Sequence, residues 1–503
     1  MPFDLTMPLE LSLAIAPEAV MFVGAMLLML VAASKGDSDA TQRFVGVGAL
    51  GVILAALATV IAMATQGRGA GAGPVASDPF RFAVAVVVLL GAFGTIALAI
   101  EDNVREGVRL GETHVLTLFA SGGMMLMGAA RDLMVLFLAI EIMSLAVYVL
   151  AGINRRSGRS AESALKYFLL GSFSTAFLLF GIALVYGATG STNLAEIGAA
   201  VGAGLGPSAG VLHVGIALML IGFAFKVSAA PFHMWAPDVY EGSPTAVTAF
   251  MAATVKAASF AAFLRVWSEA FPLAVELWRG PLMAVAILTM IVGSVVALPQ
   301  QNIKRMLAYS SIVHSGYLLI AVLANTSLGR SALLFYLVSY TLATLGSFAV
   351  VGAVSRPNEG RLGLADYHGL WHERPWLAMA MGIYMFALLG FPIFGGSGFM
   401  AKWYMLDASL AGPFTMPWVA VALVLTSAIS AGFYLYLVML MFMKDRPADH
   451  RVGATGPFTR IVIGTTAVAI LVLGIVATPL VRWAEQGAPM AGSSVSIPRS
   501  DTR

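Results

Sequence analysis

Four ionisable side chains inside long apolar stretches are the residues of this sequence best suited to chemistry. Glu141, Lys226, Lys256 and Lys402 each lie in a segment long and apolar enough to cross a bilayer as a helix. One such charge at a helix centre costs about 2.5–3.5 kcal/mol, so four cost about 10–14 kcal/mol before any pairing. Ionisable groups in this setting usually belong to ion pathways or proton relays. An ion pair that only holds helices together is the structural alternative.

Polar side chains accompany two of these charges at helical spacing. Ser144 and Tyr148 follow Glu141 at i+3 and i+7, which places all three on one face of a helix. Lys256 continues a face that carries threonines before it and Ser259 after it. Both stripes are expected to face the protein interior, where hydroxyl groups can hold water beside a charge.

The other two lysines stand next to residues that interrupt helices. Lys226 precedes Pro231, and Lys402 follows Pro392 and the glycine-rich stretch 395–398. Proline removes a backbone donor and clashes with the preceding turn, so carbonyl groups are released at membrane depth. Broken helices at matching places in two repeats mark the functional site of many transporters.

The chemistry that these residues allow is proton handling. A buried lysine can exchange its proton, whereas an arginine stays charged, so three lysines and no deep arginine favour transfer over static pairing. We expect Glu141 and Lys226 to form an ion pair across facing helices and Lys402 to be the last proton-loading site. His314, among serines 310, 311 and 315, is expected to relay protons between Lys256 and Lys402. A histidine satisfied by serine hydroxyls is the alternative.

The elements that must position these residues are membrane-spanning helices. Of the 503 residues, 59% are hydrophobic and 11% are charged, whereas soluble domains carry about 25% charged residues. We therefore predict an all-α polytopic membrane protein, one transmembrane domain over 1–503, with about fourteen spans. The spans are expected near 9–33, 44–65, 81–100, 113–130, 132–152, 162–187, 209–231, 244–267, 278–298, 303–324, 330–354, 376–411, 415–442 and 458–483.

A short internal sequence repeat suggests that the helices form two related units. The string Gly-Arg-Ser-Ala occurs at 158–161 and again at 329–332, each time at the start of a span. We predict a first antiporter-like repeat over 113–267 and a second over 278–442, each with one broken helix. The two copies begin on opposite sides of the membrane, which is the arrangement of inverted-topology repeats.

The distribution of basic residues predicts the orientation. With the N-terminus outside, the cytoplasmic loops and adjoining span ends carry 17 Lys and Arg, against 9 on the outer side. Cytoplasmic loops carry the excess of positive charge, so both termini are expected to face the periplasm. The first span is expected to remain as a helix rather than to be cleaved as a signal. The stretches 67–73 and 202–210 are expected to be short flexible loops.

Several functions are excluded by what the sequence does not contain. There is no cysteine, which removes disulfides, Cys-ligated zinc and iron–sulfur clusters. The histidines do not have metal-ligand spacing, and the net charge of +3 comes from scattered arginines that do not suggest nucleic acid. The stretch 395–402 lacks the ending of a phosphate-binding loop. We expect no metal and no cofactor in this chain, so its energy must come from neighbours.

Three stretches resemble the antiporter-like membrane subunits of respiratory complex I. They are LAIEIMSL at 138–145, FKVSAAPFHMWAPDVYEGSPT at 225–245 and QNIKRMLAYSSIVH at 301–314. Within that family the chain is most similar to the subunit N branch of bacterial NADH-quinone oxidoreductase. It lacks the C-terminal extension of subunit L, and Lys402 stands where subunit M has a glutamate.

The resemblance implies a function and partners. A proton-translocating subunit of this translocase, in the bacterial inner membrane, would work beside other membrane subunits of complex I, including antiporter-like neighbours, and membrane lipids. NADH, FMN, iron–sulfur clusters and quinone would be bound by partner subunits. The resemblance places the family's carboxylate and channel lysines on Glu141, Lys226, Lys256 and Lys402. A subunit of a multisubunit sodium/proton antiporter and an inert scaffold are the alternatives.

Overall fold

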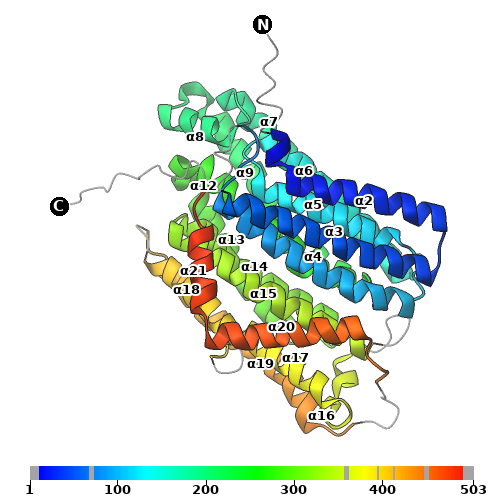
Figure 1. Cartoon of the computed structure of the whole chain (residues 1–503). Helices are drawn as coiled ribbons and strands as arrows, with labels where there is room; N and C mark the ends of the chain where they lie inside the picture. The colour runs from blue at the N-terminus through cyan, green and yellow to red at the C-terminus, as the bar shows by residue number, and fades with distance from the viewer. Residues whose placement is uncertain are drawn as a thin grey trace.

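The described residues of the computed structural model form helices joined by short connections. They are residues 11–66, 73–355, 362–392, 396–411, 414–446 and 452–490. The structure is 83% helical and, within those ranges, its extended pairing consists of three isolated bridges. The predicted all-α membrane fold is confirmed (Figure 1).

Twelve helices of the described chain are long and apolar enough to cross a membrane. They are α2 (Ala16–Lys35), α3 (Asp39–Thr65), α4 (Pro79–Arg105), α6 (Leu133–Ala151), α7 (Gly158–Thr189), α9 (Ala209–Lys226), α11 and α12 (Thr245–Phe250 and Lys256–Glu269, joined by a π turn over Met251–Val255), α13 (Val275–Ala297), α14 (Ile303–Ala324), α15 (Ser327–Val354), α19 (Pro417–Met443) and α20 (Pro457–Ile475). The number of spans would be the expected fourteen if two further elements also crossed the membrane. They are α5 (Glu112–Ala129), and α17 (Pro375–Leu389) together with α18 (Gly396–Leu410). The count of fourteen stays a prediction.

Two spans are broken where their proline and glycine residues predict breaks. After α9 ends at Lys226, irregular backbone leads to the short helix α10 (Trp235–Gly242). The other break separates α17 from α18, and its residues 393–395 lie outside the described residues. Each break begins with a left-handed residue, Ser228 with φ 57° and Gly390 with φ 79°. The predicted spans 209–231 and 376–411 thus each contain the break that was expected in them.

The last predicted span was too long for a single helix. The helix predicted over 458–483 stops at Ile475, and a second helix, α21 (Thr478–Gly487), begins with a proline in its first turn. A proline is tolerated at that position but ends a continuing helix, since it lacks the backbone N–H. In Figure 1 α21 turns away from α20 and crosses the neighbouring spans steeply. The predicted loop at 67–73 lies almost wholly outside the described residues.

Polar N-caps fix the starts of the two helices that organise the interior. The Asp132 carboxylate accepts from the amides of the first turn of α6, and the Asn302 side chain does the same for α14. Such caps satisfy amides that have no partner within the helix. Each cap also pairs with a distant backbone segment: Asp132 with Asn193, and Asn302 with Gly363.

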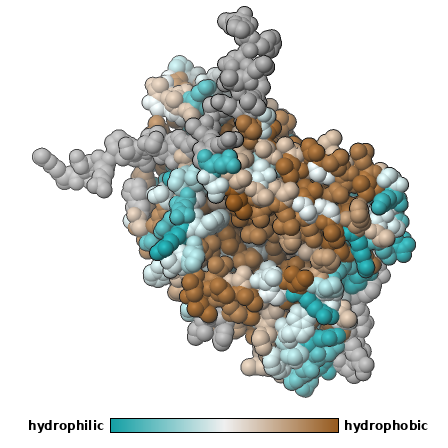
Figure 2. Space-filling model, in the orientation of Figure 1, coloured by the Kyte–Doolittle hydropathy of each residue, from teal (hydrophilic) through white to brown (hydrophobic). Residues whose placement is uncertain are grey.

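The most buried helices lie in the middle of the bundle. Each residue of α12 and nearly all of α14 are buried, whereas α2, α19 and α20 expose most of their length. Figure 2 shows broad apolar surface over the outer helices, as expected for a lipid-facing shell. The charged side chains of α12, and Lys304 and His314 on α14, are therefore enclosed by protein.

Candidate functional site

Lys226 is the last residue of α9 and points toward α6. Its ammonium group donates a 2.8 Å hydrogen bond to Ser144 Oγ and lies 5.9 Å from the centre of the Tyr148 ring. The helix ends at Lys226 because the chain turns left-handed at Ser228. The predicted polar face of α6 thus meets the lysine at the break.

The predicted direct ion pair between Glu141 and Lys226 is wrong. Within the described residues the two groups do not form an ion pair within 4.0 Å; the Lys226 ammonium group instead donates to Ser144, one turn further along α6. Glu141 is partly exposed, and its buried Oε1 has no hydrogen-bond partner. The carboxylate is near enough to interact electrostatically with Lys226. Ser144 is therefore the direct contact of the lysine, and Glu141 acts across a gap.

Lys256 connects the first break to α14. It begins α12 directly after the π turn, and its ammonium group donates to Ser311 O at 2.5 Å and to Ser315 Oγ at 2.6 Å. Ser315 Oγ in turn donates to Val227 O at 2.6 Å, on the residue next to Lys226. One hydroxyl therefore joins Lys256 to the break in α9.

His314 lies on α14 between the two lysine groups, surrounded by tyrosines. Its Nδ1 is 2.6 Å from Tyr336 Oη, and its Nε2 is 3.2 Å from Tyr434 Oη. Tyr434 is also hydrogen-bonded to Ser310. Of the three serines predicted to surround the histidine, none bonds to its ring among the described residues. The tyrosines of α15 and α19 were missed, since they are distant in sequence.

Lys402 is held at the second break. Its ammonium group donates to Leu389 O at 2.8 Å, the last carbonyl of α17, and to Ser427 Oγ at 3.0 Å. Gly390 makes this possible, because a Cβ there would lie 2.9 Å from Lys402 Cδ. Ser427 Oγ donates at 3.1 Å to the hydroxyl of Tyr317, whose ring centre is 4.9 Å from Lys402 Nζ.

A charged cluster lies beside the first break, where α7, α10 and α14 meet. Asp238 binds Lys166 and Arg305, both at 2.8 Å, and Arg305 also binds Glu241 at 3.0 Å. Burial raises the pKa of the Asp238 carboxyl, but the two cations lower that pKa by more, so the group is anionic. These residues line a cavity of about 210 Å³. The cluster provides a polar entrance toward the broken helix.

A network of buried arginine and carboxylate groups contradicts the expectation of no deep arginine. Arg265 lies in the predicted span 244–267, is 1% exposed and binds Asp78 at 2.8 Å and Glu269 at 2.7 Å. Glu269 also binds Arg131, at 3.1 Å. A guanidinium with two buried carboxylates remains charged. This network is static pairing, in contrast to the lysines, which contact neutral hydroxyls and carbonyls.

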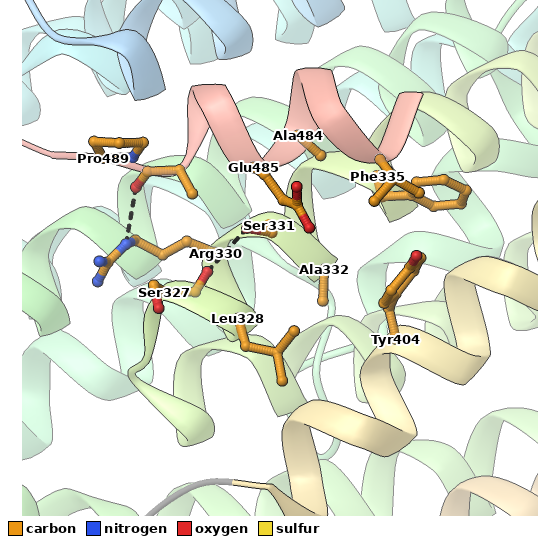
Figure 3. Close-up of a pocket in the computed structure, with 12 residues that line it drawn as sticks. Ser327, Leu328, Arg330, Ser331, Ala332, Phe335, Tyr404, Ala484, Glu485 and Pro489 are labelled. Atoms are coloured by element: carbon orange, nitrogen blue, oxygen red, sulfur yellow. Dashed lines mark hydrogen bonds between the residues drawn. The ribbon is translucent and has the colours of Figure 1, made fainter. Parts of the chain in front are cut away.

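The cavity between α15, α18 and α21 is separate from the lysines. Its volume is about 440 Å³, and Figure 3 shows Arg330, Glu485 and Tyr404 on its walls. Arg330 donates to Ala488 O at 2.9 Å, which ties α21 to the start of α15. None of Glu141, Lys226, Lys256, His314 and Lys402 lines it. Among the described residues there is also no cluster of three or more acidic or histidine side chains that could hold a metal.

Comparison with known families identifies this arrangement. Residues 130–430 match the family model of the NADH:quinone oxidoreductase/Mrp antiporter transmembrane region. The chain is 47% identical to NADH-quinone oxidoreductase subunit N of Gemmatimonas aurantiaca, over 97% of this chain and 96% of the relative. It is 41% identical to the subunit N of Trichlorobacter lovleyi, over 94% and 96% of the two chains.

This chain belongs to the NADH-quinone oxidoreductase subunit N family. Solved structures agree: a chain of respiratory complex I from Thermus thermophilus is 35% identical, with a TM-score of 0.77, over 93% of this chain and 98% of that one. A chain of the Mrp complex from Dietzia has a TM-score of 0.82 over 95% and 97% of the two chains, but only 21% identity. That likeness shows the shared fold alone, and the resemblance to the subunit N branch is confirmed.

Proposed function

We propose that this chain is a proton-translocating membrane subunit of NADH-quinone oxidoreductase. The observation that carries the proposal is the placement of two groups of polar contacts on α14, one at each helix break. The first joins Lys256 through Ser315 to the Val227 carbonyl, next to Lys226. The second joins Tyr317 through Ser427 to Lys402. A series of buried groups that can donate and accept protons is what a relay needs.

Each residue of the site has a proposed role. Glu141 sets the charge near Lys226, Lys256 passes the proton into α14, His314 relays it and Lys402 is the last loading site. The centres of the His314 and Tyr317 rings are 5.6 Å apart, and no hydrogen bond joins their polar atoms among the described residues. Passage there requires a bridging water or a side-chain movement. Such a step can be opened and closed, which a pump requires.

Two inverted repeats, 113–267 and 278–442, are supported by matching features of α6 and α14. Ser144 and His314 each lie twelve residues after the N-cap of their helix. Lys226 lies over a tyrosine ring of α6, and Lys402 lies over one of α14. The paired caps Asp132 and Asn302 make the same kind of backbone bridge. Their bridges involve segments next to α8 and α16, which lie at opposite ends of the bundle in Figure 1.

The proposed setting is the bacterial inner membrane, with both termini on the outer face. The charged cluster around Asp238 and Arg305 would then face the cytoplasm and lead to the first break. The redox cofactors, NADH, FMN, iron–sulfur clusters and quinone, would be bound by partner subunits. Moving one charge against 100 mV takes about 2.3 kcal/mol, which those partners must supply.

Purification of the chain from its native membrane in mild detergent tests the proposal. We expect flavin- and iron–sulfur-containing subunits to co-purify, and NADH to drive proton uptake into inverted vesicles. A Lys256→Ala variant should assemble on native gels but lower proton uptake per NADH oxidised. Co-purification with antiporter subunits alone would refute the assignment, and unchanged uptake in the variant would leave the chain a scaffold.

A further inference from the structure

A crevice between α3 and α4 on one side and α15 and α20 on the other is not used by the relay. Its deeper part is an apolar cavity of about 340 Å³, lined by side chains such as Leu50, Phe93, Leu342 and Ala469. Large apolar side chains at its edge are exposed, Leu90 by 46% and Ile461 by 57%. In Figure 2 the surface where these helices meet is largely apolar. At membrane depth such a space is in contact with the bilayer interior.

A second cavity, which has charged residues in its lining, lies next to the crevice. This second cavity, called the mouth, has a volume of about 440 Å³. It is formed by the same four helices, near the N-termini of α3 and α20 and the C-termini of α4 and α15. The two cavities interleave on α20, where Phe458 lines the apolar part while Pro457 and Thr459 line the mouth. On α4 they are one turn apart, at Ala97 and Glu101. The apolar cavity and the mouth are therefore neighbours, and together they are called the groove.

The charges of the mouth leave one cation without a partner. Glu101 accepts from the amides of Phe458 and Thr459 at the start of α20, at 2.8 and 3.1 Å. Asp102 binds Arg105 at 3.2 Å. Arg43 is exposed and has no ion pair or side-chain hydrogen bond to the part of the chain that the structure describes. The free positive charge of the groove is thus at its polar end.

The length of the groove matches one leaflet. Along α15 the lining extends from Val338 in the apolar part to Ser355 in the mouth, which is about 25 Å at 1.5 Å per residue. Half of a bilayer with its headgroup region is about 20–22 Å. The mouth lies at the end where α3 begins, which the positive charge of the loops assigns to the cytoplasm.

We propose that this groove binds one phospholipid of the cytoplasmic leaflet, with its phosphate at Arg43 and an acyl chain between α4, α15 and α20. One phosphodiester charge matches the one unpaired arginine, and a charge-assisted hydrogen bond from a guanidinium suits a phosphate.

Photo-crosslinking in the assembled complex tests this site. The complex is purified in mild detergent and mixed with phosphatidylethanolamine that carries a diazirine near the end of one acyl chain. After illumination, crosslinks should map to α20 between Ile461 and Ala469 and to the facing part of α15. Arg43→Gln should reduce them several-fold. Arg155→Gln, at an exposed arginine on the same predicted side but outside the groove, should leave them unchanged.

Two further measurements separate the possible occupants. A diacylglycerol with the same diazirine chain but no phosphate should crosslink several-fold less than the phospholipid. Ala469→Phe, which fills the deep end, should remove the crosslinks there while native gels show normal assembly. Equal crosslinking by the diacylglycerol, or no effect of Arg43→Gln, would overturn the proposal. A crosslink from a photoreactive residue at Leu90 to another subunit would overturn it as well, since the groove would then hold protein.

Discussion

Replacing Lys402 by arginine separates proton transfer from fixed charge. The Lys402 amine sits between Leu389 O at 2.8 Å and Ser427 Oγ at 3.0 Å, and a guanidinium can donate to both. The charge and the hydrogen bonds are therefore kept in Lys402→Arg. Reference pKa values are about 10.4 for lysine and at least about 12.5 for arginine, a difference of about 2.9 kcal/mol for proton release. The neutral form becomes at least about 100-fold rarer.

A loading site that must release its proton should then fail almost completely. We expect NADH-driven proton uptake in inverted vesicles, normalised to complex content, to fall in Lys402→Arg to the level of Lys402→Ala. The alanine variant also leaves the Leu389 carbonyl without its donor, at a cost of about 1–3 kcal/mol, so assembly must be checked on native gels. Lys35→Arg, at an exposed lysine, is the matched control. Near-normal uptake by Lys402→Arg would refute a titrating role and leave a fixed charge.

Three other predictions test the remaining groups. Lys226→Ala should lower proton uptake more than Glu141→Gln does, because the first removes a relay group and the second only a nearby charge; full uptake in both would make the two residues structural. His314→Gln should lower uptake, because an amide does not titrate, whereas it can still hydrogen-bond to Tyr336 and Tyr434; thermal stability of the complex, measured in parallel, should therefore change less than in His314→Ala, and unchanged uptake in His314→Gln would contradict the relay. For the orientation, an impermeant maleimide added to spheroplasts should label Ala203→Cys and not Asp37→Cys, and the reverse pattern would reject it.

The sequence was informative about the charged residues because burying a charge is expensive. Lys226, Lys256 and Lys402 could be singled out from their apolar surroundings alone, and the broken helices from proline and glycine beside them. The direct pairing of Glu141 and Lys226 could not be derived in this way. Helical spacing shows that Ser144 shares a face with Glu141, but not which of the two lies nearer to a lysine on another helix.

The tyrosines around the relay show a second limit. Tyr336 and Tyr434 lie on α15 and α19 and converge on His314 only in the folded bundle. From the sequence alone, a tyrosine in an apolar span is interpreted as a core residue or as a residue of the membrane interface. The hydrogen-bond partner of its hydroxyl group depends on how the helices pack. The prediction of no deep arginine failed at Arg265 for a related reason. The carboxylate that binds Arg265, Asp78, is distant in sequence, so the sequence did not reveal that a buried arginine was paired.

The π turn over Met251–Val255 places an unusual constraint on how this gene can change. A π turn holds one residue more than an α turn, so the segments before and after it are out of phase by about 100° relative to a continuous α-helix. Deleting Ala253 would let the span become a regular α-helix. Because the π turn already absorbs one extra residue, α11 and α12 would keep nearly the same relative orientation, and the contacts of Lys256 with Ser311 and Ser315 on α14 could be kept. A deletion between Lys256 and Arg265 would instead rotate one of these side chains relative to the other by about 100°, so single-codon deletions in this span should be tolerated within Met251–Val255 and not in α12.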